Sequence, residues 1–203
     1  RPFMKGPARR LWEVAYPKQP IFSSLEQAID GADTLIAGTG WASDLEFEAL
    51  QYAKLKNVYS ISVLDHWVNY EDRFVRRSIT IHPNAIWVTD EYAYALALEV
   101  FPAVTIKRIG NAYIQSLITK LNNVIGEGVL YIAEPIRGDW NSCEGAEYEV
   151  LDYIKSSLKT LKIDKQIVIR PHPSEDPNKY SEYVKKNIEF TLSRNTELSA
   201  DIA

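Results

Sequence analysis

The stretch Gln166-Ile167-Val168-Ile169-Arg170-Pro171-His172-Pro173-Ser174 is the part of the sequence that bears most directly on the fold. Its apolar run, residues 166–169, is short and bounded by turn residues, which is typical of a strand buried in a parallel sheet. The prolines that follow end the strand, because proline has no N–H group to donate to a neighbouring strand. Arg170, His172 and Ser174 are therefore predicted at the carboxyl end of a parallel strand.

This position favours ligand binding, because ligands of open α/β sheets bind at the carboxyl ends of the strands. A cation, an imidazole and a hydroxyl group at one edge suit an anionic ligand, most simply a phosphate. The competing interpretation is a turn in which Ser174 or Asp176 caps a helix over residues 177–187. That interpretation does not explain why an arginine and a histidine are combined between prolines, so we favour the functional one.

The rest of the chain alternates between strand-like and helix-like segments. The predicted strands are residues 33–37, 58–64, 85–89, 104–109, 129–133, 166–169 and 188–192. The predicted helices are residues 8–16, 24–31, 43–57, 90–100, 114–123, 145–161 and 177–187, followed by a polar tail. Ser24, Ser43 and Asp90 are predicted to begin their helices as N-caps. Such alternation with short connections indicates an α/β fold with parallel sheets covered by helices.

The pattern restarts after Gly126-Glu127-Gly128, which predicts two Rossmann-like halves, residues 1–125 and 126–203. The second half has only three predicted strands and no capped end, and a sheet of that size leaves much apolar surface exposed. We therefore expect residues 1–203 to be a fragment that is cut at both ends, with the second half incomplete.

Composition excludes several classes of protein. The chain has 203 residues, of which 46% are hydrophobic and 25% charged, as in soluble globular proteins. Its net charge of -4 gives no support to nucleic-acid binding. Cys143 is the only cysteine, so neither a disulfide framework nor a cysteine metal site is expected, and the compartment is expected to be reducing. No apolar run approaches the ~18 residues of a membrane helix. We expect a cytoplasmic protein, free or held at the inner face of the membrane.

In the first half, Gly38-Thr39-Gly40 separates a predicted strand from a predicted helix. A phosphate or an acceptor group could bind there, at the N-terminus of the helix. The alternative is a tight turn that needs glycine for backbone freedom, and Ser43 stands where a dinucleotide fingerprint has its third glycine. Ser43 and Glu46 form a predicted capping box, which gives Glu46 a structural role. Asp44 is closer to the loop and is a candidate general base.

Asp65-His66-Trp67 follows the apolar run 58–64. A carboxylate beside an imidazole can do acid–base chemistry, so Asp65 and His66 are catalytic candidates. Neighbouring residues of an extended chain point in opposite directions, however, and a structural hydrogen bond is an equally open role for His66. Packing is favoured over sugar stacking for Trp67. In the second half, Arg137 and Gly138 could contact a phosphate or an acceptor, or belong to a solvated loop.

Two Rossmann-like halves and the His172-Pro173 pair after a strand resemble the GT-B class of glycosyltransferases. Within it, the pair is similar to the His-Pro motif of the bacterial CMP-sugar transferases, the sialyl-, polysialyl- and Kdo-transferases of capsule and lipopolysaccharide synthesis. The resemblance implies metal-independent transfer from a nucleotide-sugar donor to a glycan or lipid-linked acceptor, without a cofactor. His172 would contact the donor phosphate with help from Arg170 and Ser174, and Asp44 or Asp65 would be the catalytic acid of the first half.

Other functions stay open at the level of the sequence. A related GT-B protein could be a nucleotide-sugar epimerase, a nucleotide-sugar hydrolase or a polyol-phosphate transferase. A protein of a different class, a non-catalytic Rossmann-type module, would bind a nucleotide or a protein partner. Two measurements separate these hypotheses. One identifies the donor nucleotide that the protein binds, and the other determines the effect of replacing His172.

Overall fold

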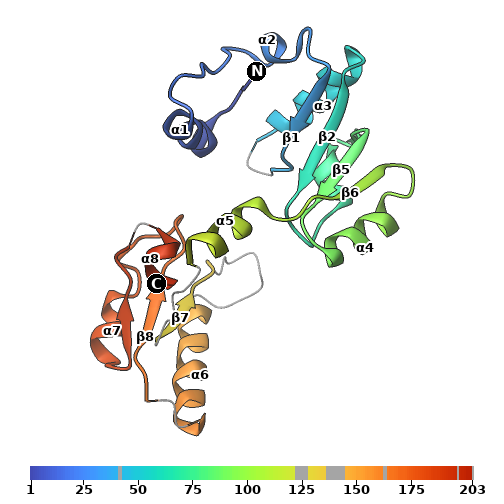
Figure 1. The fold of residues 1–203 in the computed structure, drawn as a ribbon. Helices are drawn as coiled ribbons and strands as arrows, with labels where there is room; N and C mark the ends of the chain where they lie inside the picture. Colours follow the sequence, from blue (N-terminus) through green and yellow to red (C-terminus); the bar gives the residue numbers. More distant parts are fainter. Residues whose placement is uncertain (41–42, 122–127, 136–144, 162–163, 196, 203) are drawn as a thin grey trace. The chain divides into compact units, whose positions relative to one another are not determined.

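A computed structural model describes residues 1–40, 43–121, 128–135, 145–161, 164–195 and 197–202 (Figure 1). The chain divides into two compact units, Arg1–Ala112 and Tyr113–Ala203. Both units contain a parallel sheet with helices, which confirms the α/β class. The division falls before the predicted boundary at residues 126–128, so the helix α5 (Ala112–Leu121) is grouped with the second unit. Residues 126 and 127 of that boundary lie outside the described part.

Unit 1 is built on a four-stranded parallel sheet, an arrangement compatible with a Rossmann-like fold. In spatial order its strands are β1 (Thr34–Ala37), β2 (Tyr59–Leu64), β5 (Ala85–Val88) and β6 (Thr105–Arg108). Ile36 pairs with Ile61, Ile61 with Ala85, and Ala85 with Thr105. The helix α3 (Leu45–Leu55) packs on β1 and β2, and α4 (Glu91–Val100) packs on β5 and β6. All four predicted strands of the first half are therefore present.

The helices of unit 1 begin in two different ways. Ser24 caps α2 (Leu25–Ile29) and Asp90 caps α4, each by accepting a hydrogen bond from a backbone N–H three residues later, as predicted. The capping box predicted at Ser43 is wrong. Asp44 occupies the N-cap position of α3, and Ser43 Oγ accepts a hydrogen bond from Leu45 N at 3.4 Å. The side chain of the fourth residue of that box, Glu46, lies against Gly40.

A two-stranded hairpin follows β2 and carries two arginines. It is preceded by a short 3-10 helix (Glu71–Phe74) and formed by β3 (Val75–Arg76) and β4 (Ile79–Thr80). Its two turn residues, Arg77 and Ser78, have φ angles of 50° and 64°. Two consecutive residues with positive φ are what a tight hairpin turn requires. The remaining helix of unit 1, α1 (Gly6–Ala15), has no buried residue.

Unit 2 is built on a three-stranded parallel sheet, in the order β7 (Val129–Ile132), β8 (Ile167–Arg170) and β9 (Phe190–Leu192). Val129 pairs with Ile167, and Ile167 pairs with Phe190. Besides α5, its helices are α6 (Ala146–Leu161), α7 (Ser181–Lys186) and α8 (Leu198–Ile202). The predicted strands of the second half are therefore confirmed. Among the described residues of either unit, no helix is long and apolar enough to cross a bilayer.

Two predictions for unit 2 are wrong. The helix predicted from Pro177 begins at Ser181, and Tyr180 in the N-cap position makes no capping bond through its side chain. Neither Ser174 nor Asp176 caps it, because Asp176 Oδ1 instead accepts a hydrogen bond from Asn178 N at 2.8 Å. The predicted polar tail contains α8. Asp201 of α8 forms an ion pair with Arg170, 31 residues away, a contact that the local sequence does not show.

Each unit has its own apolar core. The largest fully buried members of the unit 1 core come from the sheet, the 3-10 helix and the end of α4: Leu64, Ile86, Val88, Phe74 and Phe101. Those of unit 2 come from β8, β9, α6 and the turn before α7: Ile167, Ile169, Phe190, Leu151 and Tyr180. These cores fix the sheets and thereby the positions of the strand ends.

We expect Leu64→Ala to lower the free energy of unfolding of unit 1 by about 2–5 kcal/mol, because it leaves a cavity at a fully buried position. Urea denaturation of the full chain measures this. Leu55→Ala is the matched control, since Leu55 is 78% exposed, and its expected effect is within about 0.5 kcal/mol. Equal effects of the two substitutions would contradict the packing described here.

Candidate functional site

The polar stretch Arg170–Ser174 lies at the carboxyl end of β8, as predicted. Two backbone hydrogen bonds bring the ends of the other strands to the same edge. Ala133 N, after β7, donates to Arg170 O at 2.9 Å, and Ser193 N, after β9, donates to Ile169 O at 2.8 Å. We call this end of the sheet, from Arg170 to Ser174 with Ser193 and Asn195, the unit 2 edge. Ligands of open α/β sheets bind at such an edge.

His172 and Ser174 are in direct contact at the unit 2 edge. His172 Nδ1 lies 2.7 Å from Ser174 Oγ and accepts a hydrogen bond from Ser174 N at 3.2 Å. Because a backbone N–H can only donate, Nδ1 carries the lone pair and the proton of the neutral ring is on Nε2. Nε2 has no partner among the described residues. The half-buried imidazole is thus oriented with one N–H group available to a ligand.

Arg170 is held by contacts within unit 2. Its guanidinium forms an ion pair with Asp201 of α8, and Nη1 donates to the carbonyl of Asn195 at 3.0 Å. Ser193 Oγ and Asn195 Nδ2 also donate to Asp201 Oδ1, at 2.6 and 2.7 Å. Asp201 is not among the predicted site residues, because no local pattern marks it as the partner of an arginine 31 residues away. The phosphate contact expected of Arg170 stays a prediction.

The environment of Asp201 changes its acidity. Burial alone would raise the pKa of this carboxyl, whose side chain is 2% exposed. The hydrogen bonds from Ser193, Arg170 and Asn195 outweigh burial, so the pKa of Asp201 lies below its usual value. The charged form is therefore the one that the folded protein stabilises.

A second, partly buried ion cluster fixes the turn beyond His172. Lys179 Nζ pairs with Glu147 Oε1 at 2.6 Å and with Glu175. Burial lowers the pKa of Lys179, but the hydrogen bonds to the two carboxylates outweigh it, and the net pKa is raised. Glu175 N in turn donates to His172 O at 3.0 Å. Prolines on both sides and this cluster make the turn rigid, as a preorganised site requires.

Two predicted contacts of this edge cannot be placed, because Arg137 and Gly138 lie outside the described residues. Their assignment to a phosphate or an acceptor stays a prediction. The described segment after β7 reaches Pro135 and includes the exposed Glu134.

In unit 1, the loop Gly38-Thr39-Gly40 lies at the carboxyl end of β1, as predicted. Its backbone carbonyls are bound by arginines. Arg73 Nη1 donates to Thr39 O at 2.9 Å, and Arg76 Nη2 donates to Gly40 O at 3.2 Å. Thr39 Oγ1 donates to Val63 O at 3.3 Å, which ties the loop to β2.

A carboxylate, not an anion-binding space, lies beside this loop. Glu46 Oε1 would be 3.0 Å from a Cβ atom placed on Gly40. A phosphate bound at the loop would meet this negative charge, so the geometry favours the acceptor alternative over a phosphate. Glu46 lies in the first turn of a helix, as predicted. Its predicted capping role is wrong, because its side chain approaches Gly40, and this approach depends on the conformation of the loop.

Asp44, the predicted general base, is paired with two guanidinium groups. Its Oδ1 lies 3.1 Å from Arg76 Nε and its Oδ2 lies 3.6 Å from Arg77 Nη2. Both arginines belong to the hairpin of β3 and β4, so only the folded chain brings them to Asp44. Arg76 is the closer partner, and the pair with Arg77, whose side chain is 87% exposed, is weak; the role of Asp44 as a general base stays a prediction.

The Asp65-His66-Trp67 stretch follows β2 and is open to solvent. Asp65 Oδ1 and His66 Nε2 are 3.6 Å apart, and their side chains are 66% and 56% exposed, so their interaction is weak. The prediction that Trp67 packs in the interior is wrong, since this residue is 62% exposed. Its indole N–H donates to Asp90 Oδ2 at 2.9 Å, which holds the ring at the surface. Catalytic roles of Asp65 and His66 stay predictions.

Among the described residues, no group of three or more histidine, cysteine or acidic side chains is placed to hold a metal ion. No protein-family model matches the chain, and neither a curated protein nor a solved structure is significantly similar to it.

Asp201→Asn should destabilise unit 2 in a pH-dependent way. A carboxyl with a lowered pKa stabilises the fold above the unfolded value of 3.8, and this contribution is lost as the pH falls through the folded pKa. We expect a loss of about 1–3 kcal/mol near neutral pH that narrows below pH 3.8. Urea denaturation over this pH range measures it, with the exposed Asp164→Asn as control. A loss of unfolding free energy in Asp201→Asn that does not change with pH would contradict the lowered pKa of Asp201.

Proposed function

We propose that this protein is a glycosyltransferase that moves a sugar from a nucleotide-activated donor, most simply a CMP-sugar, to a hydroxyl group of a glycan or lipid-linked acceptor. The observation that carries the proposal is the state of His172. Its ring is fixed by Ser174 through Nδ1, and its Nε2–H group is without a partner among the described residues at a strand edge where ligands of α/β sheets bind.

The chemistry of such a transfer needs a hydrogen-bond donor at this place. When the bond between the anomeric carbon and the donor phosphate breaks, its electron pair goes to the phosphate oxygen, where negative charge develops. A fixed N–H group aimed at that oxygen stabilises the charge without a metal ion. Rigid prolines and the Lys179 cluster keep His172 in place, so little reorganisation is needed during the reaction.

The acceptor would be activated by a carboxylate, and unit 1 carries several at the ends of its strands. A general base must be able to reach the hydroxyl proton of the acceptor. Asp65 is exposed and Asp44 is paired with arginines, so of the two predicted residues Asp65 is the more available. The proposal places the reaction in surface-polysaccharide synthesis, in the cytoplasm or at the inner face of the membrane.

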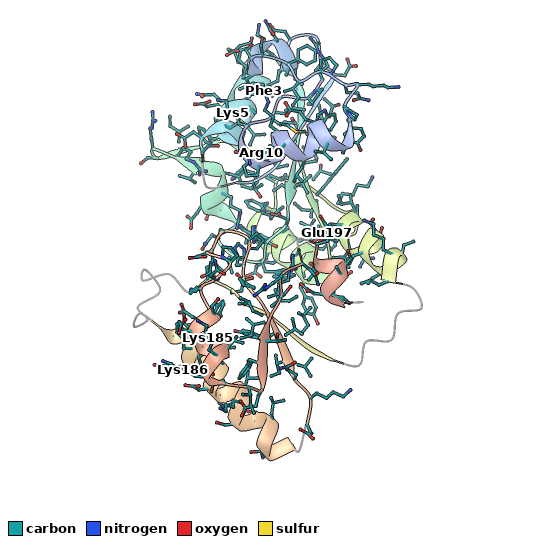
Figure 2. All side chains as sticks on the ribbon, turned by 90° about the vertical axis from the view of Figure 1, so that its left-hand side faces the viewer. Phe3, Lys5, Arg10, Lys185, Lys186 and Glu197 are labelled. Atoms are coloured by element: carbon teal, nitrogen blue, oxygen red, sulfur yellow. The ribbon has the colours of Figure 1, made fainter. Side chains whose placement is uncertain are left out.

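Nucleotide binding tests the proposal. Titration calorimetry of the full chain with CMP is expected to show binding, and His172→Ala is expected to weaken it by about tenfold or more, because a hydrogen bond to a charged phosphate is lost. Lys186→Ala is the control. Lys186, labelled in Figure 2, lies in the last turn of α7, close to Ile188, whose carbonyl accepts from Gln166 before β8. The substitution Lys186→Ala thus removes a positive charge at the end of the sheet that lies opposite the unit 2 edge.

The outcomes separate the hypotheses. Binding of UDP or CDP without CMP would refute the CMP donor and favour a related nucleotide-sugar or polyol-phosphate enzyme. Unchanged nucleotide binding in His172→Ala would remove the observation on which the proposal rests. Equal losses in His172→Ala and Lys186→Ala would show a general electrostatic effect and not a contact of His172 with the phosphate.

A further inference from the structure

Trp67 is an exposed aromatic residue that follows β2. Its side chain is 62% exposed, and the neighbouring Val68 is 60% exposed. Single exposed apolar residues are common on protein surfaces, so exposure alone does not mark a site. Trp67 differs from the other exposed tyrosine and tryptophan residues of the described part of the chain, because its polar group alone is hydrogen-bonded to another side chain, that of Asp90. The ring is thus exposed and fixed at the same time.

Two hydrogen bonds from different elements hold the segment around Trp67. Trp67 Nε1 donates to Oδ2 of Asp90, the N-cap of α4, at 2.9 Å. Arg73 Nε donates to Val68 O at 3.2 Å, and Nη1 of the same buried arginine donates to Thr39 O. The segment after β2 is therefore tied to the ends of β5 and β1. A side chain that is fixed before a ligand arrives binds it at a lower entropic cost.

Two open polar side chains precede the ring in the chain. Asp65 Oδ1 and His66 Nε2 are 3.6 Å apart, so the carboxylate and the imidazole lie together at the end of β2, and both are more than half exposed. The carboxylate can accept hydrogen bonds, and the imidazole can donate or accept them. Ligands of α/β sheets bind at this edge. A fixed aromatic ring and two available hydrogen-bonding groups thus occupy three consecutive positions there.

These groups define the chemical class of a ligand. The carboxylates of Asp65 and Asp90 disfavour an anion such as a phosphate. A purely apolar ligand would make no use of Asp65 and His66. A sugar ring suits all three positions, because its C–H groups pack on an indole ring while its hydroxyl groups bond to a carboxylate and an imidazole. A neutral sugar is therefore the ligand that fits this edge.

We propose that Trp67 is the platform of a sugar-binding site in which Asp65 and His66 bind the hydroxyl groups of the sugar. All three residues belong to unit 1. The sequence favoured packing over sugar stacking for Trp67, and the exposure of its ring supports the second role. Only the identification of this sugar as the acceptor rests on the glycosyl transfer proposed above.

Saturation-transfer NMR tests the site. The full chain is mixed with the methyl glycosides of glucose, galactose and N-acetylglucosamine, and at least one of them is expected to bind. The signal is expected to disappear in Trp67→Ala, because the sugar loses the ring on which it packs. Tyr59→Ala, expected to keep the signal, is the matched control, since Tyr59 is 46% exposed at the opposite end of the same strand. Absence of a signal with all three glycosides, or a signal that persists in Trp67→Ala, would overturn the inference.

Two further variants separate stacking from a loss of structure. Trp67→Phe keeps an aromatic face without the hydrogen bond to Asp90, so its sugar binding is expected to be weaker but detectable. Asp65→Ala removes an acceptor of hydrogen bonds, and its affinity is expected to fall about threefold or more. Equal losses of binding in Trp67→Phe and Trp67→Ala would contradict stacking, and an unchanged affinity in Asp65→Ala would contradict the contact of Asp65 with the sugar.

A CMP titration of the same variants separates this inference from the proposed function. We expect Trp67→Ala to bind CMP within about twofold of the unmodified chain, because the donor phosphate is assigned to His172 of unit 2. Sugar binding that depends on Trp67, in a chain that does not bind CMP, would leave the sugar site standing and refute the donor. CMP binding that is lost in Trp67→Ala would show stacking of a nucleobase and overturn the sugar site. CMP binding that depends on His172, without sugar binding, would refute only the role of Trp67.

Discussion

Parallel pairing of short strands is the constraint on which both units depend. Strands of this kind need helical connections, which cover the sheet, and they bring all their carboxyl ends to one edge. In unit 2 this edge gathers the ends of β7, β8 and β9, and with them Arg170 and Ser193. In unit 1 it gathers Thr39 and Asp65, the residues that follow β1 and β2. Both candidate sites are consequences of this topology.

At each edge, arginines form ion pairs with acidic groups. Arg170 engages Asp201 in unit 2, and Arg76 and Arg77 engage Asp44 in unit 1. A carboxylate that is paired and hydrogen-bonded contributes to the fold, and one that is buried without a partner weakens it.

Sequence patterns predicted the elements whose signals are local. The apolar runs at 58–64 and 166–169 became β2 and β8, and Asp90 became an N-cap, because an apolar run and a capping residue are signals carried by adjacent residues. The predicted start of α7 at Pro177 was wrong because the four residues before Ser181 form turns, anchored by the half-buried side chain of Lys179 and the buried side chain of Tyr180. Their partners come from other parts of unit 2.

The sequence by itself determined the α/β class, the ends of the main strands and the neighbourhood of His172 and Ser174, which are only two residues apart. Tertiary structure alone decided the state of the carboxylates. Asp44 meets Arg76 across 32 residues, through the hairpin that follows β2, while the side chain of Glu46, two residues further along the chain, lies against the loop at Gly40. Pairing of charges depends on distances between atoms far apart in the chain, and those distances exist only once the sheet has formed.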